Sequence, residues 1–169
     1  MPADPSPLPI VAEPGGRYAR NPPLVVDCSV LAAVLFDEPE REAAAMAMAG
    51  RDLFAPDLLD HEMVSVALKK ASAGLADAAQ QALADLADLR LARCRVDPQA
   101  QFKLARELNL TAYDAAYLQL AIELGAPLAT FDRTLGRAAQ HVFDGGRDKD
   151  IAAAKSATTT RKGCWSSTI

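Results

Sequence analysis

Four acidic residues stand at positions where a folded chain could gather their carboxylates into one pocket. Asp27 directly follows the apolar run 24–26, and Asp132 directly follows a second short apolar run. Glu62 and Asp114 fall near the starts of two expected helices. Grouped carboxylates repel one another and raise one another's pKa, so such a pocket is costly without a cation. Oxygen ligands favour Mg²⁺ or Mn²⁺ over zinc, and a cation held in this way binds phosphate oxygens and activates water for attack on phosphorus.

Each acid also has a role that involves no chemistry. Asp27 and Asp132 suit turn or N-cap positions after a strand, Asp114 suits the positive end of a helix dipole, and Glu62 suits a solvated helix face. Taken singly, none of them identifies a site. The combination is more specific, because an acid at the carboxyl end of a strand occurs twice.

The clearest helix is predicted between Thr111 and Gly125. Thr111 is expected as its N-cap, and Gly125 followed by Pro127 as its stop. The helical spacing predicts one apolar face, which consists of Tyr113, Ala116, Tyr117, Leu120, Ala121 and Leu124.

The remaining pattern alternates short apolar runs with helical segments. Strands are expected at 24–26, 53–55, 91–96, 128–131 and 142–143. Helices are expected after a Ser29 N-cap, from Pro39 at N1 to Gly50, from an Asp57 N-cap to about 71, and at 77–89, 99–108 and 133–140. Such alternation predicts an α/β fold in which helices cover both faces of a mainly parallel sheet. Sites in open α/β sheets lie beyond the carboxyl ends of the strands, where Asp27 and Asp132 are expected.

Length and composition predict one domain with two tails. The chain has 169 residues, of which half are apolar, enough for one sizeable core. Residues 1–22 are Pro-rich and are expected to form a flexible leader, and 23–144 the domain. Residues 145–169 have no apolar period and are expected to be disordered.

Charge and residue usage exclude several classes of function. The net charge of −4 provides no general attraction for nucleic acid, so an RNA contact needs a local basic patch. Two histidines argue against a zinc site or a Ser-His-Asp triad. Cys28, Cys94 and Cys164 form no CxxC pair and are expected as free thiols of a reducing compartment. With no signal peptide and no membrane-spanning run, we expect a cytoplasmic protein.

Four blocks of the sequence resemble the signature blocks of PIN-domain ribonucleases. They are Val-Val-Asp-Cys-Ser-Val-Leu at 25–31, the helix with His61-Glu62, Tyr-Asp-Ala-Ala-Tyr-Leu-Gln-Leu-Ala at 113–121, and Ala-Thr-Phe-Asp-Arg-Thr-Leu at 129–135. Their order and the chain size look most like the VapC toxins of type II toxin–antitoxin pairs. The resemblance covers about 24–143. It departs from the family at Cys28, where a small hydroxyl residue is more usual.

The resemblance implies a three-layer α/β/α PIN fold and a set of roles. Asp27, Glu62, Asp114 and Asp132 would be both the metal ligands and the catalytic acids of an endoribonuclease that uses Mg²⁺ or Mn²⁺. Ser29 and Thr130 match polar positions that flank the site. The family also implies a homodimer and a VapB-like antitoxin that inserts a segment into the active-site groove.

Other residues outside the acid set are also candidates for contacts. Arg133 is the strongest candidate for an RNA contact, because it follows Asp132 and begins a helix. The basic residues Arg93, Arg95, Lys103 and Arg106 are expected to be solvated. Met46 and Met48 are expected at an interface with a second copy or an antitoxin.

Three alternatives remain open at this point. A PIN nuclease of ordinary RNA processing would act without an antitoxin. A catalytically inert PIN-like binding module would have no evident use for four acids. A phosphatase with Asp27 as the covalent nucleophile ranks low, because position 29 is Ser rather than a second acid.

Overall fold

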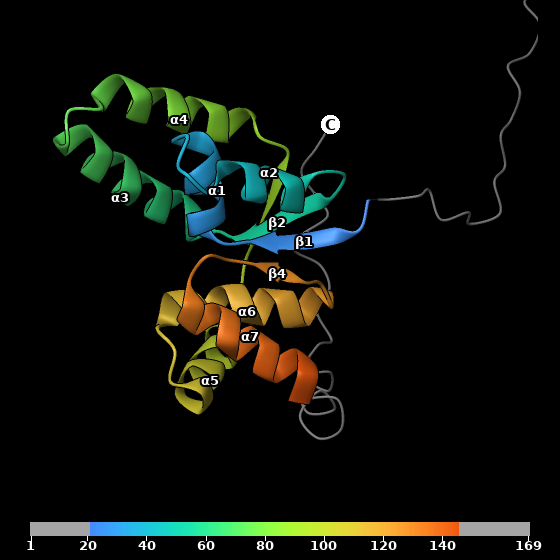
Figure 1. The fold of residues 1–169 in the computed structure, drawn as a ribbon. Coiled ribbons are helices and arrows are strands. Elements are labelled where there is room, and N and C mark those ends of the chain that lie inside the picture. Colours follow the sequence, from blue (N-terminus) through green and yellow to red (C-terminus); the bar gives the residue numbers. More distant parts are fainter. Residues whose placement is uncertain (1–20, 146–169) are drawn as a thin grey trace, which may run out of the picture.

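The computed structural model describes residues 21–145, in which helices alternate with four short strands (Figure 1). Most of the predicted leader and tail therefore lies outside the described residues, and the domain boundaries stay a prediction. The elements in chain order are β1 (Pro23–Val26), α1 (Cys28–Leu35), α2 (Arg41–Met48), β2 (Asp52–Pro56), α3 (Leu59–Ser72), α4 (Ala76–Asp88), β3 (Leu91–Cys94), α5 (Pro98–Leu108), α6 (Ala112–Leu124), β4 (Leu128–Ala129) and α7 (Arg133–Gly145).

The four strands form one parallel sheet in the order β3-β2-β1-β4. β1 pairs with β2 on one side, where Val25 lies opposite Phe54, and with β4 on the other, where Val26 lies opposite Ala129. The chain thus leaves β1 in one direction along the sheet and later returns to its other side. The switch point, at which open α/β sheets bind their ligands, lies between the carboxyl ends of β1 and β4.

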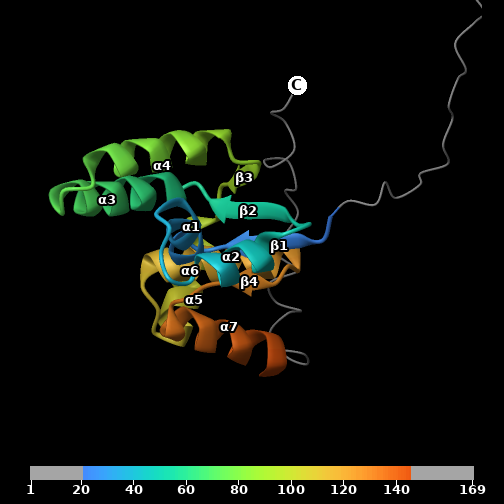
Figure 2. The same ribbon diagram turned by 45° about the horizontal axis from the view of Figure 1, so that its top comes forward.

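Helices cover both faces of the sheet, which confirms the predicted three-layer α/β/α fold. α5, α6 and α7 lie on one side, and α1 to α4 lie on the other, with α3 and α4 side by side as a helical pair (Figures 1 and 2). The core between these layers includes fully buried side chains from both sides, among them Val25, Val26, Leu31, Leu59, Met63, Leu118 and Leu135. Each large apolar side chain buried in this way contributes about 1.5–3 kcal/mol.

α6 is the central helix of its layer. Its predicted ends are confirmed, because Thr111 is the N-cap and Gly125 ends the helix in the left-handed conformation. The predicted single apolar face is wrong, because residues 115–121 are all buried while Tyr113 is 60% exposed. α6 contacts three strands as well as α5 and α7, so it is enclosed on nearly all sides.

Three helix starts differ from the sequence prediction. Asp27, not Ser29, is the N-cap of α1, because the Ser29 backbone N–H points to the Asp27 carboxylate. α3 begins at Leu59, because the backbone N–H of Asp57 donates to the carbonyl of Cys94 and so extends the β2–β3 pairing. α2 begins at Arg41, after Glu40 as N-cap, which leaves Pro39 before the helix.

The predicted strand at 142–143 is wrong. Val142 and Phe143 belong to α7, which continues to Gly145. Together with Leu135 and Ala139 they repeat at helical spacing and pack against the main core. The strand predicted for 128–131 is also shorter, because Thr130 and Phe131 lie beyond the last residue of β4.

Two smaller expectations have mixed outcomes. Cys28 is a free, buried thiol as predicted, whereas Cys94 is disulfide-bonded, and Cys164 lies outside the described residues. Met46 is 73% exposed, while Met48 packs partly against the core. Among residues 21–145, none of the helices has both the length and the apolar character needed to cross a bilayer.

Candidate active site

Asp27 is buried at the carboxyl end of β1, with only 7% of the residue exposed. Its Oδ2 atom accepts hydrogen bonds from the Ser29 hydroxyl at 2.6 Å and from the Thr130 hydroxyl at 2.9 Å. The backbone N–H of Ser29 is a longer third donor at 3.4 Å. These donors fix one oxygen of a buried carboxylate that has no basic partner among the described residues.

The segment after β4 is fixed to the same place. The oxygen of the Thr130 hydroxyl accepts from the backbone N–H of Asp132 at 2.9 Å, and the Ser29 hydroxyl oxygen accepts from Phe131 N–H at 3.0 Å. Asp132 in turn caps α7, because its Oδ1 accepts from the backbone N–H groups of the first helical turn. The structure therefore brings Asp27, Ser29, Thr130 and Asp132 together at the switch point.

Glu62 lies in the first turn of α3 and is partly buried. The phenol of Tyr117 donates a hydrogen bond of 2.5 Å to its Oε2 atom. Burial raises the pKa of Glu62, and the charges of Asp27 and Asp114 raise it further, while the bond from Tyr117 lowers it. The charge interactions show that the structure brings Glu62 near both aspartates.

Asp114 lies in the first turn of α6 and is also partly buried. Its backbone N–H donates to the Thr111 hydroxyl oxygen at 3.0 Å, which is the helix cap. The Thr111 hydroxyl donates at 2.8 Å to Oδ2 of the Asp114 carboxylate. The capping group is therefore Thr111, and the carboxylate of Asp114 is not needed to cap the helix.

The four acids share one hydrogen-bonding pattern. Within residues 21–145, one oxygen of each carboxylate accepts the hydrogen bonds and the other accepts none. The ion pairs of the described residues use other acids, namely Asp37, Glu38, Asp60 and Glu107. Each of these four carboxylates is thus held in place, has no basic partner among the described residues, and has one oxygen that accepts no hydrogen bond from them.

This donor set fits a hard divalent cation in its chemistry. All four donors are carboxylate oxygens, which suit Mg²⁺ and Mn²⁺. Among the described residues, however, no three acidic, histidine or cysteine side chains are gathered closely enough to hold an ion. The donor chemistry therefore suits such a cation, while the described residues form no closed coordination shell for one.

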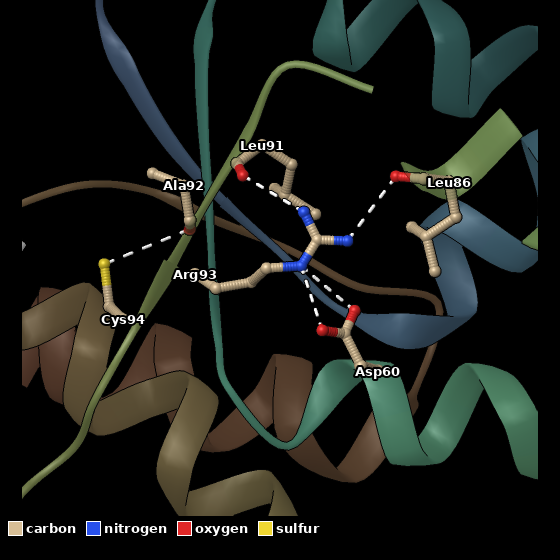
Figure 3. A network of polar contacts seen from close by, with 6 residues as sticks. All are labelled: Asp60, Leu86, Leu91, Ala92, Arg93 and Cys94. Carbon is tan, nitrogen blue, oxygen red and sulfur yellow. Dashed lines mark hydrogen bonds and ion pairs between the residues drawn. The ribbon is translucent and has the colours of Figure 1, made fainter. Parts of the chain in front are cut away.

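Two arginines, Arg93 and Arg133, have very different surroundings. Arg93 is bound on three sides: its Nε donates to the Asp60 carboxylate at 3.0 and 3.1 Å, and its terminal nitrogens donate to the carbonyls of Leu86 and Leu91 (Figure 3). Its predicted role as a solvated side chain is therefore wrong, because it ties α3, α4 and β3 together. Arg133 is exposed at the start of α7 and has no ion pair within residues 21–145.

Tyr117 is the residue at this site that the sequence prediction missed. The helical spacing places it only on the apolar face of its helix, yet its hydroxyl contacts one of the four acids. The available signal was the residue type itself, because a buried tyrosine hydroxyl needs a hydrogen-bond partner. Its spacing from Asp114, three residues along one helix, was a second signal.

Comparisons with known proteins agree with this fold. The family model described as the PIN domain matches residues 24–140. Ribonuclease VapC3 from Pyrobaculum aerophilum is 36% identical over 120 residues, which cover 66% of this chain and 91% of that protein. The crystal structure of PAE2754 from the same organism has the same fold, with a TM-score of 0.57, 23% identity, and coverage of 70% of this chain and 85% of that one. This chain belongs to the PIN-domain family.

Proposed function

We propose that the protein is a metal-dependent endoribonuclease and that it acts in the cytoplasm as the toxin of a VapBC-type toxin–antitoxin pair. The observation that carries the proposal is that Asp27, Glu62, Asp114 and Asp132 are each fixed by hydrogen bonds and yet have no basic partner within the described residues. Negative charge arranged in this way favours a site for a cation. The 36% identity to a protein named Ribonuclease VapC3 supports RNA as the substrate.

In this proposal Asp27, Glu62, Asp114 and Asp132 hold Mg²⁺ or Mn²⁺ through the oxygens that accept no hydrogen bond within the described chain. When bound, the cation supplies a Lewis acid for the scissile phosphate and lowers the pKa of a water molecule. Ser29 and Thr130 keep the carboxylate of Asp27 in one orientation and connect it to the Asp132 loop. Arg133, exposed beside Asp132, contacts an RNA phosphate.

The proposed protein partners are supported by the name of the same relative and by the surface of the described chain. A VapB-like antitoxin and a second copy of the chain are the proposed partners. Binding of either one could bury apolar side chains that are exposed in the single chain. They include Met46 on α2, Leu68 on α3 and Phe102 on α5, each more than 60% exposed. An exposed apolar surface of this kind is typical of interaction sites when its members are contiguous.

Controlled expression in bacteria tests the toxin function. Wild-type protein should stop growth and produce new RNA 5′ ends at defined positions, whereas Asp114→Asn, which keeps its hydrogen-bond acceptor for Thr111, should do neither. A short antitoxin reading frame beside the gene should restore growth when it is expressed together with the wild type. If RNA is cleaved without growth arrest and no such reading frame exists, the nuclease belongs to ordinary RNA processing instead.

A further inference from the structure

Tyr117 is a fully buried side chain that carries a polar group to the edge of the site. It is 1% exposed, in the middle of α6, and it is the bulkiest of the fully buried side chains in the described chain. Its hydroxyl reaches Oε2 of Glu62 on α3, 55 residues away in the sequence. The bond therefore joins the helix layers on opposite faces of the sheet beside the carboxyl ends of the strands.

Neither side chain in this bond has a second hydrogen-bond partner within the described residues. Within the described residues, Glu62 accepts no other hydrogen bond and forms no ion pair, and the Tyr117 hydroxyl has no other acceptor. A buried tyrosine could satisfy its hydroxyl with a backbone carbonyl at less cost than with a partly buried carboxylate. The choice of Glu62 as the acceptor therefore points to a role in holding that carboxylate.

Glu62 differs from the other three acids in how it is held. Asp27, Asp114 and Asp132 are each fixed by groups close to the start of their own helix, although Thr130 also contributes to Asp27. Glu62 receives no such bond from α3, which has no side-chain cap. Its orientation depends on a donor from another layer of the fold.

α6 positions two acids at once through one face. Asp114 and Tyr117 are three residues apart on this helix, so their side chains leave it on the same side. Glu62 is also close enough to Asp114 for the two charges to interact. The helix thus contributes its own carboxylate and, one turn later, the donor that orients a second one.

We propose that Tyr117 is a positioning residue: its buried hydroxyl binds Oε2 of Glu62 and so fixes the orientation in which Oε1 of that carboxylate meets the divalent cation of the proposed function. This inference rests on the proposed function, since it assumes that the acids bind metal. Partners that orient a metal ligand contribute substantially to affinity, and their loss weakens metal binding by about 10–100-fold.

Tyr117→Phe tests the inference because it removes only the hydroxyl. Tyr113→Phe is the matched control, because Tyr113 lies on the same helix but is 60% exposed and forms no hydrogen bond within residues 21–145. Mn²⁺ binding to the full chain is measured by calorimetry, without RNA. We expect Tyr117→Phe to raise the Kd for Mn²⁺ by about tenfold, and Tyr113→Phe to leave it unchanged.

A double-mutant cycle separates this role from simple packing. In the Glu62→Gln background, Tyr117→Phe should cause no further loss of Mn²⁺ affinity, because the carboxylate that it orients is gone. An equal loss in both backgrounds would overturn the inference, and so would identical Mn²⁺ affinities for Tyr117→Phe and Tyr113→Phe. A wild-type chain that binds no Mn²⁺ would overturn the proposed function and this inference with it.

A second measurement keeps Tyr117 in place, so it remains informative even if the Tyr117→Phe chain fails to fold. In the Tyr113→Phe chain, Mg²⁺ should change the near-ultraviolet absorbance of tyrosine, because the acceptor of the Tyr117 hydroxyl becomes a metal ligand. The same titration of Tyr113→Phe combined with Glu62→Gln should show no change. Identical spectra with and without saturating Mg²⁺ in the first variant would contradict the inference.

Discussion

The hydroxyl of Thr130 donates a hydrogen bond of 2.9 Å to the Asp27 carboxylate, across 103 residues of sequence. The two residues follow the neighbouring strands β4 and β1, so this bond connects the segments that leave these two strands at the switch point. The same hydroxyl oxygen accepts from the backbone N–H of Asp132. Thr130 thus contacts two acids, Asp27 and Asp132, that lie far apart in the sequence, and it helps to set their relative position.

Thr130→Val should therefore affect stability and activity together. The substitution keeps the shape but leaves the Asp132 N–H without its acceptor and the buried Asp27 oxygen with one donor fewer. We expect a loss of about 1–3 kcal/mol in the free energy of unfolding and a fall in RNA cleavage of about tenfold. Thr134→Val is the control, because the Thr134 side chain is exposed and forms no hydrogen bond in the described chain. Equal effects of the two substitutions in denaturant unfolding would contradict this role.

Substitutions of Asp114 and of its capping residue Thr111 should have different effects on the stability of the metal-free chain. Asp114→Asn retains an acceptor for the Thr111 hydroxyl and removes charge repulsion with Glu62, so metal-free stability should stay equal or rise while cleavage is lost. Thr111→Ala removes the cap of α6 and should lower stability by about 1 kcal/mol. Thermal unfolding in metal-free buffer makes the comparison. A large loss of Tm for Asp114→Asn would show that the carboxylate is structural.

Glu62 should make the stability of the metal-free chain depend on pH. Its pKa is raised in the folded state, so its protonated form is favoured there. The resulting stability is present below the ordinary pKa of 4.5 and is lost as the pH rises through the raised folded value. Glu62→Gln still offers an acceptor to Tyr117 and should increase the Tm near neutral pH by about 1–3 °C, with the gain shrinking as the pH falls.

The control for the pH experiment is Glu42→Gln, since Glu42 is an exposed glutamate that also lies in a first helical turn. It should give no gain in Tm at neutral pH, because an exposed acid at that position interacts favourably with the helix dipole. A gain for Glu62→Gln that is the same at every pH would exclude the ionisation of Glu62 as its cause.

Arg133 and Arg93 should behave in opposite ways. Arg133→Ala should change stability by no more than about 0.5 kcal/mol but lower the slope of log K against log salt for RNA binding by about 0.7–1. Arg93→Ala breaks an ion pair and bonds to two carbonyls, so it should lower stability by about 1–2 kcal/mol. Its salt slope should stay at the wild-type value. An unchanged slope for Arg133→Ala would remove Arg133 from the RNA contacts.

Local signals in the sequence predicted the parts of the structure that depend on neighbouring residues. The N-cap at Thr111, the stop at Gly125 and the apolar strand before Asp27 were all confirmed, because each depends on the chemistry of adjacent residues. The end of α7 was missed, because Val142 and Phe143 have high strand propensity, whereas in the structure they continue the helix and pack against the core.

The contacts around the acids could not be predicted in the same way. Tyr117 meets Glu62 across 55 residues, and Arg93 meets Asp60 across 33. Such pairs depend on how α3, α6 and β3 are placed by the sheet, and no local pattern encodes that placement. The roles of the four acids remain a prediction, which the structure supports through their shared hydrogen-bonding pattern.

The most direct test of this account is cleavage of total cellular RNA by purified, antitoxin-free protein, with Mn²⁺ or Mg²⁺ and with chelator, beside Asp114→Asn. We predict cleavage that requires the cation and is lost in Asp114→Asn, while the Tm of that variant in metal-free buffer equals or exceeds the wild-type value. Cleavage that persists in chelator, or that Asp114→Asn retains, would contradict the assignment of the four carboxylates as a metal-dependent nuclease site.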